Sequence, residues 1–586
     1  MPLPIWLEKF HRFRNGGGRG FIFTGNTCDL VFVDDEQLPP PCQLKFFLAQ
    51  LLQTEGYEVY LFSLATGLQT LNSGRNSNVL QNIANPRDIE EVLTAFTGAL
   101  RKRVPKIALI IDYADHLAPH SQGLNAVLAP QHLLALQTFH SWGNDDTIRS
   151  TDNLIILLSH ENQINDLLTK IGSGYFVITI ELPNEEVRYA FANLLLDLHD
   201  KGRDFGALAN DFSLNDFARL TSGLRLRDIE GLFREAGASK EEINRNKIKG
   251  IKSEVIRQLA GGLLEVVDTD YGLEAIGGSL HIKNYISTLK WRWLNGATDI
   301  PQAMLLAGVP GCGKSFSVKA IAKELSLPLL VMRNIREQWV GASERNLEFV
   351  LQILETLAPA LVWIDELDQA LGQRTTGQSA DAGTSERMLA RIWEFMGAMR
   401  HRGRILWVAT TNRPDLLDAA TLDRFPVVIP LIHPSPGEIG ELLPLLCKQL
   451  NRQLASDVRF SEVVSLPSLR LPTIRGLQEI IAKAGEFADR ETKRIGSTIY
   501  HTHILSAAKL YKPNYNPLLH SFIALTALRM TSFQDLLPWY DNPSYEFPPY
   551  LEGLVNDQGE LDIYKLNERI NQLQQQLQWE RFARQF

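Results

Sequence analysis

The chain has 586 residues, 45% of them hydrophobic and 22% charged, which is enough for roughly three to five domains that each bury a core. This composition excludes wholesale disorder and collagen-like repeats. The 59 basic and 67 acidic residues give a net charge of −8, which excludes a global positive field that would gather nucleic acid or an acidic membrane.

The N-terminus and the cysteines predict a cytoplasmic protein without membrane insertion. The segment from Met1 to Gly20 has no apolar run that could serve as a signal-peptide core, and no stretch approaches about 18 uninterrupted apolar residues. The four cysteines lie far apart and form no CxxC pair: Cys28, Cys42, Cys312 and Cys447. This spacing argues against a zinc site or a disulfide framework and suits a reducing compartment.

Two series of short apolar runs predict two parallel β-sheets. The first series is Gly20 to Thr24, Ile107 to Asp112, Leu154 to Ser159 and Val177 to Ile180. The second series is Ala303 to Ala307, Leu361 to Asp365, Ile405 to Ala409 and Val427 to Leu431. Longer amphipathic stretches separate the runs, as expected of strands that are covered by helices. The expected fold class is therefore α/β, in two similar modules.

A weak internal repeat supports the two modules. The segment from Leu224 to Leu232 aligns with that from Leu469 to Leu477, an offset of 245 residues, and both run into helix-like segments. We therefore divide the chain into a first α/β domain (1–185), a helical lid and linker (186–265), a second α/β domain (266–432), a second helical lid (433–510) and a C-terminal tail (511–586).

The tail is expected to be separate from these domains and to end in a helix from Leu561 to Phe582. This helix is rich in Gln and has one apolar face. Packing on its own domain is favoured over coiled-coil pairing, because fewer than about four clear heptads are present.

A phosphate-binding loop is predicted from Gly308 to Ser315, which fits the pattern GxxxxGK[ST]. A strand precedes the loop, and a helix from Phe316 to Leu325 follows it. The loop amides and the helix N-terminus would hold phosphate oxygens, Lys314 would reach the β and γ phosphates of ATP, and the Ser315 hydroxyl would bind Mg²⁺. The expected nucleotide contacts are Gly308, Val309, Pro310, Gly311, Cys312, Gly313, Lys314, Ser315 and Phe316.

Two carboxylates follow the next apolar run of the second module. Asp365 ends this predicted strand and could hold Mg²⁺ through its water shell, while Glu366 could polarise a water for attack on the γ-phosphate. Alone, an Asp-Glu pair after a strand is usually a solvated turn. About 50 residues after a phosphate loop, it indicates catalysis.

These motifs resemble those of the AAA family of ring-forming ATPases, and the resemblance covers residues 271 to 485. It implies two RecA-like P-loop NTPase (AAA+) modules, each with a small helical lid. It also implies Mg²⁺-dependent ATP hydrolysis by a homo-oligomeric ring, expected to be a hexamer. The tandem arrangement is similar to that of two-module AAA proteins from cyanobacteria and plastids.

The same resemblance assigns further roles. Ile276 and Gly277 lie in a segment that resembles the one along the adenine, and Asn412 lies in a segment resembling the sensor strand that orients water and γ-phosphate. The segment from Trp339 to Glu344 resembles the first pore loop. In it, Trp339 and Val340 would grip a polypeptide in the central channel.

The second module departs from the family pattern at its arginines. The segment after the sensor strand keeps only Arg424, which we take as the candidate finger for a neighbouring subunit; a surface arginine at a strand start is the alternative. Arg475 resembles the second sensor arginine of the wider AAA+ class and could touch the γ-phosphate in cis. A structural salt bridge is its alternative role.

The first module departs further. Its loop from Phe21 to Leu30 has one glycine and no lysine, Tyr113 stands where Glu366 stands in the second module, and Glu230 takes the place of Arg475. We therefore expect a degenerate RecA-like domain that has lost hydrolysis and serves as a structural or substrate-facing layer.

The leading functional hypothesis is an ATPase ring that remodels or unfolds a protein client through its pore. The alternative is a nucleotide-controlled oligomeric scaffold or regulator with slow hydrolysis. A nucleic-acid-handling protein is a third reading, suggested only by Arg475. The acidic charge and the lack of a helix-turn-helix or zinc module argue against it.

Overall fold

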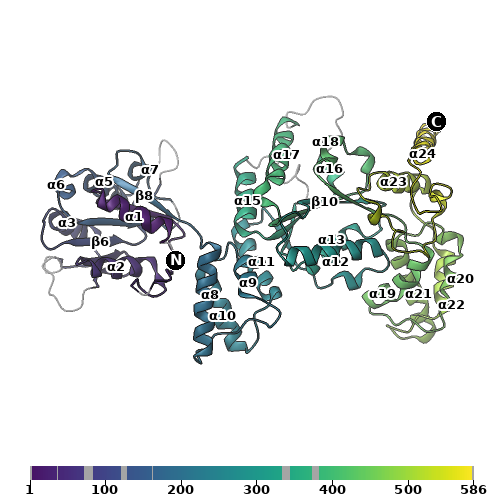
Figure 1. Cartoon of the computed structure of the whole chain (residues 1–586), viewed down its shortest axis with the longest axis horizontal. Helices are drawn as coiled ribbons and strands as arrows, with labels where there is room; N and C mark the ends of the chain where they lie inside the picture. The colour runs from purple at the N-terminus through teal and green to yellow at the C-terminus, as the bar shows by residue number, and fades with distance from the viewer. Residues whose placement is uncertain are drawn as a thin grey trace. The chain divides into compact units, whose positions relative to one another are not determined.

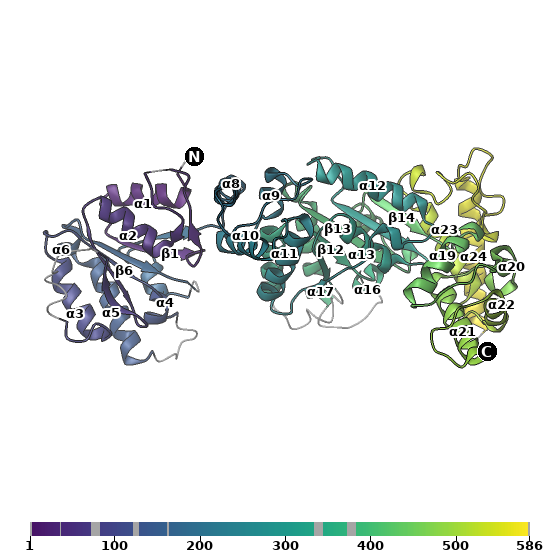
Figure 2. The ribbon, with the colours of Figure 1, turned by 90° about the horizontal axis from the view of Figure 1, so that it is seen from below.

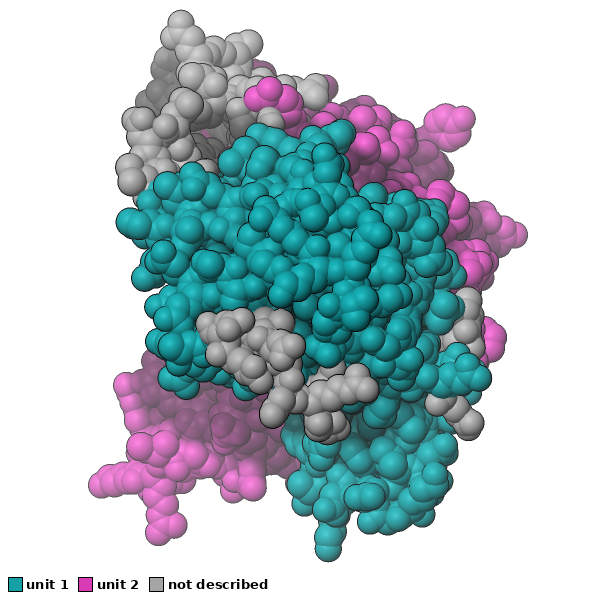
Figure 3. All heavy atoms as spheres, turned by 90° about the vertical axis from the view of Figure 1, so that its left-hand side faces the viewer, with its two compact units in different colours: residues 1–244 teal, residues 245–586 magenta. Residues whose placement is uncertain are grey.

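The computed structural model describes residues 3–35, 37–71, 83–120, 128–160, 163–332, 344–371 and 382–583. The chain divides into two compact units, residues 1–244 and 245–586, which Figure 3 colours separately. The boundary falls inside the segment that the sequence assigns to the first lid and linker. Helix α11 (Arg245–Ala260) belongs to the second unit, because its Ile256 and Ala260 are buried in that unit's core.

The first unit contains a six-stranded sheet in the order β5-β4-β6-β7-β1-β8. All neighbours are parallel except the β4–β5 pair. The strands are β1 (Gly20–Gly25), β4 (Glu58–Ser63), β5 (Gly67–Thr70), β6 (Ile107–Ile111), β7 (Leu154–Leu158) and β8 (Tyr175–Ile180). The four expected strands of this half are thus confirmed to within two residues at each end.

Helices cover both faces of this sheet, as Figure 2 shows. On one face α1 (Ile5–Asn15) and α2 (Leu44–Thr54) bury Phe10 and Phe47 against Phe21 and Phe23 of β1. The other face is covered by α3 (Ile89–Leu100) and α5 (Pro130–Asn144). The shorter elements are β2 (Leu30–Val31), β3 (Cys42–Gln43), α4 (Ala114–Leu117), α6 (Asp146–Arg149) and α7 (Asp166–Thr169).

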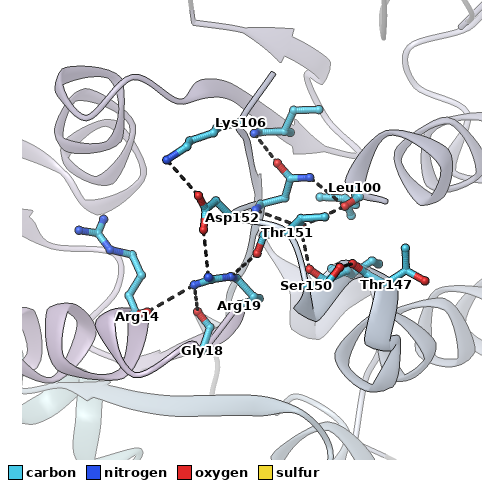
Figure 4. Close-up of polar contacts among 12 residues, drawn as sticks. Arg14, Gly18, Arg19, Leu100, Lys106, Thr147, Ser150, Thr151 and Asp152 are labelled. Carbon is cyan, nitrogen blue, oxygen red and sulfur yellow. Dashed lines mark hydrogen bonds and ion pairs between the residues drawn. The ribbon is translucent and has the colours of Figure 1, made fainter. Parts of the chain in front are cut away.

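Arg19 ties the start of β1 to the start of β7 (Figure 4). Its guanidinium donates to the carbonyl oxygens of Arg14 and Thr151 and pairs with Asp152 at 3.1 Å, and Lys106 pairs with the same carboxylate at 3.0 Å. Asp152 is half exposed, so these ion pairs fix the geometry of the strand ends more than they stabilise the fold.

Three helices complete the first unit: α8 (Glu185–Asp200), α9 (Leu214–Leu220) and α10 (Leu226–Ser239). The Asn184 and Ser213 side chains accept from backbone N–H groups in the first turns of α8 and α9, so the sequence marks where both helices begin.

The second unit repeats the sheet topology in the order β9-β11-β12-β13-β10-β14. The strands are β9 (Glu265–Val267), β10 (Ala303–Gly308), β11 (Leu329–Met332), β12 (Ala360–Ile364), β13 (Ile405–Thr411) and β14 (Val427–Leu431). The two sheets differ in the edge strand that lies opposite β14 and β8. In the second sheet this strand, β9, comes before the other strands in the sequence, whereas in the first sheet it is β5, which follows β4.

Helices cover both faces of the second sheet as well (Figure 1). One layer contains α12 (Leu280–Leu294) and α13 (Lys314–Glu324), and the other contains α11, α15 (Glu344–Leu357) and α17 (Ala382–Gly397). Two short helices follow strands β12 and β13: α16 (Leu367–Leu371) and α18 (Ala419–Leu422).

The second lid is a helical cluster with its own core. It contains α19 (Pro436–Gln449), α20 (Phe460–Val464), α21 (Ile474–Thr492) and α22 (His501–Leu510). Ser435 and Glu438 form a reciprocal capping box, with Pro436 at the first helical position, which defines where α19 begins.

The C-terminal segment is not separate from the second α/β domain, contrary to the expectation from its sequence. Helix α23 (Pro517–Arg529) packs on β10 and β14, and its Phe522 and Leu525 belong to the same core as Leu306. Helix α24 (Ile563–Ala583) packs on α23. The reason is that β14 is an edge strand, and α23 covers the apolar surface beside it.

Among the described residues, no helix has both the length and the apolar character needed to cross a membrane.

Candidate nucleotide site

The parallel register of the second sheet brings the expected motifs to one edge. Ala307 of β10 lies opposite Thr411 of β13, and Ile364 of β12 lies opposite Ala409 of the same strand. The loop after Gly308 and the acid pair after Ile364 therefore leave the sheet at its carboxyl edge, where open α/β sheets bind ligands.

Glycines allow the loop between β10 and α13 to take its shape. A Cβ atom on Gly308 would lie 1.9 Å from the carbonyl oxygen of Leu431, so no larger residue fits there. Gly313, directly before α13, has a φ of 91°, which places it in the left-handed region that glycine enters without strain. Helix α13 begins at Lys314, so its N-terminal amides face the space above the loop.

A cavity of about 390 Å³ lies at this edge. Its walls come from the loop, the acid pair, β13, the segment before α12, and the lid helices α19 and α21. The residues expected from the sequence that line it are Ile276, Gly277, Pro310, Gly311, Cys312, Gly313, Lys314, Ser315, Phe316, Asp365, Glu366, Asn412 and Arg475. Gly308 and Val309 do not line the cavity, and both are buried.

Lys314 is buried in the floor of this cavity. Its Nζ donates to the carbonyl oxygens of Gly308 at 2.9 Å and Val309 at 2.8 Å. Burial lowers the pKa of Lys314 to about 8, although the negative charges of Asp368 and Asp365 oppose the shift. The ammonium group is therefore a poorly hydrated cation that an anionic ligand would stabilise.

Thr410 positions the acid pair. Its hydroxyl donates to Oδ1 of Asp365 at 2.7 Å and accepts from the backbone N–H of Glu366 at 3.3 Å. Burial, and then the negative charges of Asp365 and Asp368, raise the pKa of Glu366. A carboxylate with a raised pKa is a better proton acceptor than an ordinary glutamate.

Sequence reasoning missed Thr410 and Asp368. Asp368 accepts from the Thr411 hydroxyl at 2.8 Å and from the Asn412 N–H at 3.3 Å, so it fixes the end of β13. The available signals were the two threonines directly before Asn412 and a third acid three residues after Asp365. Neither signal can be interpreted until strands β12 and β13 are known to be neighbours.

The lid closes one side of the cavity through backbone contacts. The N–H of Arg475, in the first turn of α21, donates to the carbonyl oxygen of Gly311 at 3.1 Å. The N–H groups of Gly278 and Ser279 donate to Glu441 and Glu438 of α19, at 3.1 and 2.7 Å. Hydrogen bonds thus join the lid to the loop and to the segment around Ile276.

The residues around the cavity fit ATP and Mg²⁺. Ser315 and Asp365 supply a hydroxyl and a carboxylate oxygen, the hard ligands that Mg²⁺ prefers. Within the described ranges, no group of three or more His, Cys, Asp or Glu could hold a metal by itself. Two protein ligands suit an ion that keeps several waters and shares phosphate oxygens with a nucleotide.

The sequence matches three family descriptions in succession. Residues 304–431 match the ATPase family associated with various cellular activities (AAA). Residues 1–183 match the N-terminal Rossmann-like domain of AAA+ chaperones, and residues 186–261 match their second helical domain. The second module is therefore an AAA domain, and the first 261 residues resemble the N-terminal part of AAA+ chaperones.

Several curated proteins are similar to this chain. The Cell division cycle protein 48 homolog of Archaeoglobus fulgidus is 24% identical over 70% of this chain and 58% of its own length. Protein mac-1 of Caenorhabditis elegans is 24% identical over 64% of this chain and 52% of its own length. The uncharacterized AAA domain-containing protein ycf46 of Trieres chinensis is 31% identical over 45% of this chain and 52% of its own length. The chain therefore spans just over half the length of these relatives.

Arg424 lies apart from the cavity of this AAA domain. It follows α18, is exposed, and is not among the residues that line the cavity. The expected pore-loop residues Trp339 and Val340 lie outside the described residues.

The equivalent edge of the first AAA module differs from the sequence expectation in one respect. The loop after β1 contains no lysine, as expected, but Lys45 enters from the start of α2 and pairs with Asp112 at 2.8 Å. A cation is therefore present beside the aspartate of the first module. Sequence reasoning missed it because 19 residues, Asn26 to Leu44, separate β1 from Lys45, compared with five, Val309 to Gly313, between β10 and Lys314.

Proposed function

We propose that the second AAA module binds ATP with Mg²⁺ and hydrolyses it to ADP and phosphate, and that the chain uses this reaction to remodel a protein client. One observation carries the proposal most directly. Glu366, with its raised pKa, lies in the same cavity as the buried cation of Lys314. A candidate base and a candidate phosphate-binding cation thus face one space, and the lid closes one side of it.

Each residue of the cavity has a proposed role in this reaction. Lys314 binds the β and γ phosphates, while Glu366 accepts a proton from the attacking water and Asn412 orients that water. Ser315 and Asp365 hold Mg²⁺, which neutralises the charge that develops on the phosphates. Ile276 and Gly277 lie along the base of the nucleotide. Arg475 brings a second cation from the lid, and its charge contributes to the lowered pKa of Lys314.

Completion of the site by a neighbouring subunit is the second part of the proposal. Arg424 is exposed and lies apart from the cavity of its own subunit, as a residue that acts on another subunit must. Such arginine fingers accelerate hydrolysis by about 10³ to 10⁵. We therefore propose a homo-oligomeric ring, with a hexamer as the expected size.

The client and the location are proposals that rest on the sequence motifs. Trp339 and Val340 would grip the polypeptide in the pore, and the chain would act in the cytoplasm. The similarity to the Cell division cycle protein 48 homolog of Archaeoglobus fulgidus supports an ATP-driven machine of this kind.

Phosphate release and particle mass together test the proposal. The chain with ATP and Mg²⁺ should release phosphate, and Arg424→Ala should remove most of this activity. Mixing Arg424→Ala with Lys314→Met subunits should restore part of it, because the two defects lie on opposite sides of a shared site. A particle that stays monomeric in ATP, or the absence of recovery in mixtures, would contradict a shared site.

The Glu366→Gln variant distinguishes the scaffold alternative from remodelling. If Glu366→Gln stops hydrolysis but leaves the function with the partner intact, binding of nucleotide rather than its turnover is what matters. Loss of partner function in this variant supports remodelling.

A further inference from the structure

A cysteine, a histidine and an aspartate of the first module meet at the carboxyl edge of its sheet. Cys28 lies in the loop after β1, Asp112 directly follows β6, and His160 lies two residues after the end of β7. The three strands are neighbours, in the order β6-β7-β1. This edge is where open α/β sheets bind ligands.

Hydrogen bonds join these three side chains in series. Nε2 of His160 lies 2.6 Å from Oδ1 of Asp112, and Nδ1 of the same ring lies 3.2 Å from Sγ of Cys28. Burial acts to raise the pKa of Asp112, but the hydrogen bonds from His160 and Lys45 outweigh it, so this pKa is lowered. An ionised carboxylate only accepts hydrogen bonds, so Nε2 carries the proton and Nδ1 is left as an acceptor.

Thr27 also contacts the imidazole and leaves this path open. Its hydroxyl donates to the carbonyl oxygen of Ser159 at 3.0 Å, and the same oxygen lies 2.8 Å from Nδ1 of His160. Because the carbonyl takes the hydroxyl proton, the lone pair of Nδ1 is available to the thiol of Cys28. A nucleophile, a base and a group that orients the base are thus in contact.

The thiol is accessible but needs a base to react. Cys28 is exposed. Partial burial of the sulfur, followed by the charge of Asp112, raises the pKa of Cys28, so the thiol keeps its proton at neutral pH. A thiol of high pKa is a strong nucleophile once its proton is removed, and Nδ1 of His160 is in position to remove it.

A cavity of about 90 Å³ adjoins the thiol and limits what can react there. Cys28 and His160 line it together with two cations, Lys45 and Arg227, and one acid, Asp112. The volume admits a molecule of few atoms and excludes a peptide or an acylated substrate. The cations favour an electrophile that develops negative charge as it reacts. Hydrogen peroxide meets both conditions, because it is small and its O–O bond breaks to release hydroxide.

We propose that Cys28 is a site of base-assisted oxidation by hydrogen peroxide, with His160 as the base and Asp112 as the residue that positions the imidazole. His160 takes the thiol proton, the sulfur attacks one peroxide oxygen, and the O–O bond breaks. The departing hydroxide takes the proton from His160 and leaves as water. The sulfur is oxidised to a sulfenic acid and the peroxide is reduced, and a small-molecule thiol returns the sulfenic acid to the thiol.

Oxidation of the full chain by hydrogen peroxide, with dimedone trapping of sulfenic acids and mass spectrometry of peptides, tests this proposal. Cys28 should be oxidised faster than Cys42, which is partly exposed and serves as a reference within the same chain. His160→Gln has a side chain that cannot take the thiol proton, so oxidation of Cys28 should slow by about tenfold or more while that of Cys42 stays unchanged. His140→Gln, at an exposed position of α5, should be oxidised like the unmodified chain.

A comparison of two peroxides needs no variant and covers the case in which His160→Gln fails to fold. Cumene hydroperoxide is too bulky for a cavity of about 90 Å³, so the preference for hydrogen peroxide over it should be larger at Cys28 than at Cys42. Equal preferences at the two cysteines would overturn the proposal. An unchanged rate for Cys28 in folded His160→Gln would also overturn it, since exposure alone would then explain the reaction.

Discussion

Glu366 and Tyr113 occupy equivalent positions in the two modules and share a left-handed backbone, with φ values of 49° and 55°. Each follows an aspartate at the end of a strand: Asp365 after β12 and Asp112 after β6. Non-glycine residues adopt this conformation at a cost in energy. The same left-handed turn therefore follows the aspartate in both modules, but only the second module has a carboxylate at this position.

Glu366→Gln tests the catalytic half of this relationship. The amide keeps the size of the side chain but cannot accept a proton from water, so phosphate release should fall by about 10² to 10⁴. Binding of ATP should persist, as measured with a fluorescent analogue. The matched change in the first module, Tyr113→Phe, should leave phosphate release unaltered, and an equal loss in both variants would show that the effect is structural.

Thr410→Val tests whether the hydroxyl beside Asp365 matters for activity. Valine has nearly the same shape but donates no hydrogen bond to the carboxylate, so Asp365 and the backbone of Glu366 would lose their shared partner. We expect phosphate release to fall by about tenfold to a hundredfold, as for other residues that orient metal ligands. The buried Thr526, whose hydroxyl bonds within α23, gives the control: Thr526→Val should keep its activity. Full activity in Thr410→Val would remove Thr410 from the site.

The sequence predicts the parallel strands, and the glycine-rich loop between β10 and α13, from local signals. Continuous apolar runs give the strands, and the spacing of Gly308, Lys314 and Ser315 gives the loop. The contact of Thr410 with Asp365 joins residues 45 positions apart, so it depends on the order of strands in the sheet. Sequence spacing alone does not contain that order.

The packing of the C-terminal segment shows the same limit. Phe522 and Leu525 could belong to any amphipathic or buried helix, and the turn-rich stretch after α23 suggested an independent tail. These residues are buried beside β10 and β14 because α23 covers the sheet next to its edge strand. The position of that edge depends on the order of the strands in the folded sheet. Lys45 was missed for a related reason, since its partner Asp112 lies 67 positions along the chain.

The lowered pKa of Lys314 predicts a pH dependence for ATP binding. With a pKa of about 8, the side chain is charged below pH 8 and becomes neutral above it. Binding of the anionic nucleotide needs the charged form, so Kd should rise by up to about tenfold per pH unit above pH 8. Calorimetry at pH 7 and pH 9 measures this change. Lys314→Arg stays charged throughout, so its Kd should be nearly constant over the same range.

The four cysteines should differ in reactivity toward iodoacetamide. Burial raises the pKa of Cys312 to about 12 and that of Cys447 to about 11, and both thiols are inaccessible. Cys28 is exposed, and Cys42 is partly exposed. Cys28 should therefore be alkylated first and Cys312 and Cys447 last, as followed by mass spectrometry of peptides. Early labelling of Cys312 in a folded sample would contradict the packing of the phosphate loop.

The buried pair His433 and His520 predicts that the second unit loses stability in acid. Nε2 of His433 lies 3.3 Å from Nδ1 of His520, and both rings are buried. His433 lies beside Tyr550, and His520 stacks on Tyr515. Burial, followed by the charge of the neighbouring histidine, lowers the pKa of His433 to about 3. Burial, followed by the charge of Lys314, lowers that of His520 to about 4.

The sign of the effect follows from proton uptake. Between the ordinary histidine pKa of about 6.5 and the lowered values, the unfolded chain binds protons that the folded chain does not, so the free energy of unfolding decreases as pH falls. At pH 5 each histidine should cost about 2 kcal/mol relative to pH 7. The midpoint of urea unfolding, followed by exchange of α23, should shift less with pH in His520→Gln than in the unmodified chain. His140→Gln, at an exposed position, should keep the full shift. Equal shifts in all three proteins would mean that both rings are already hydrated in the folded chain.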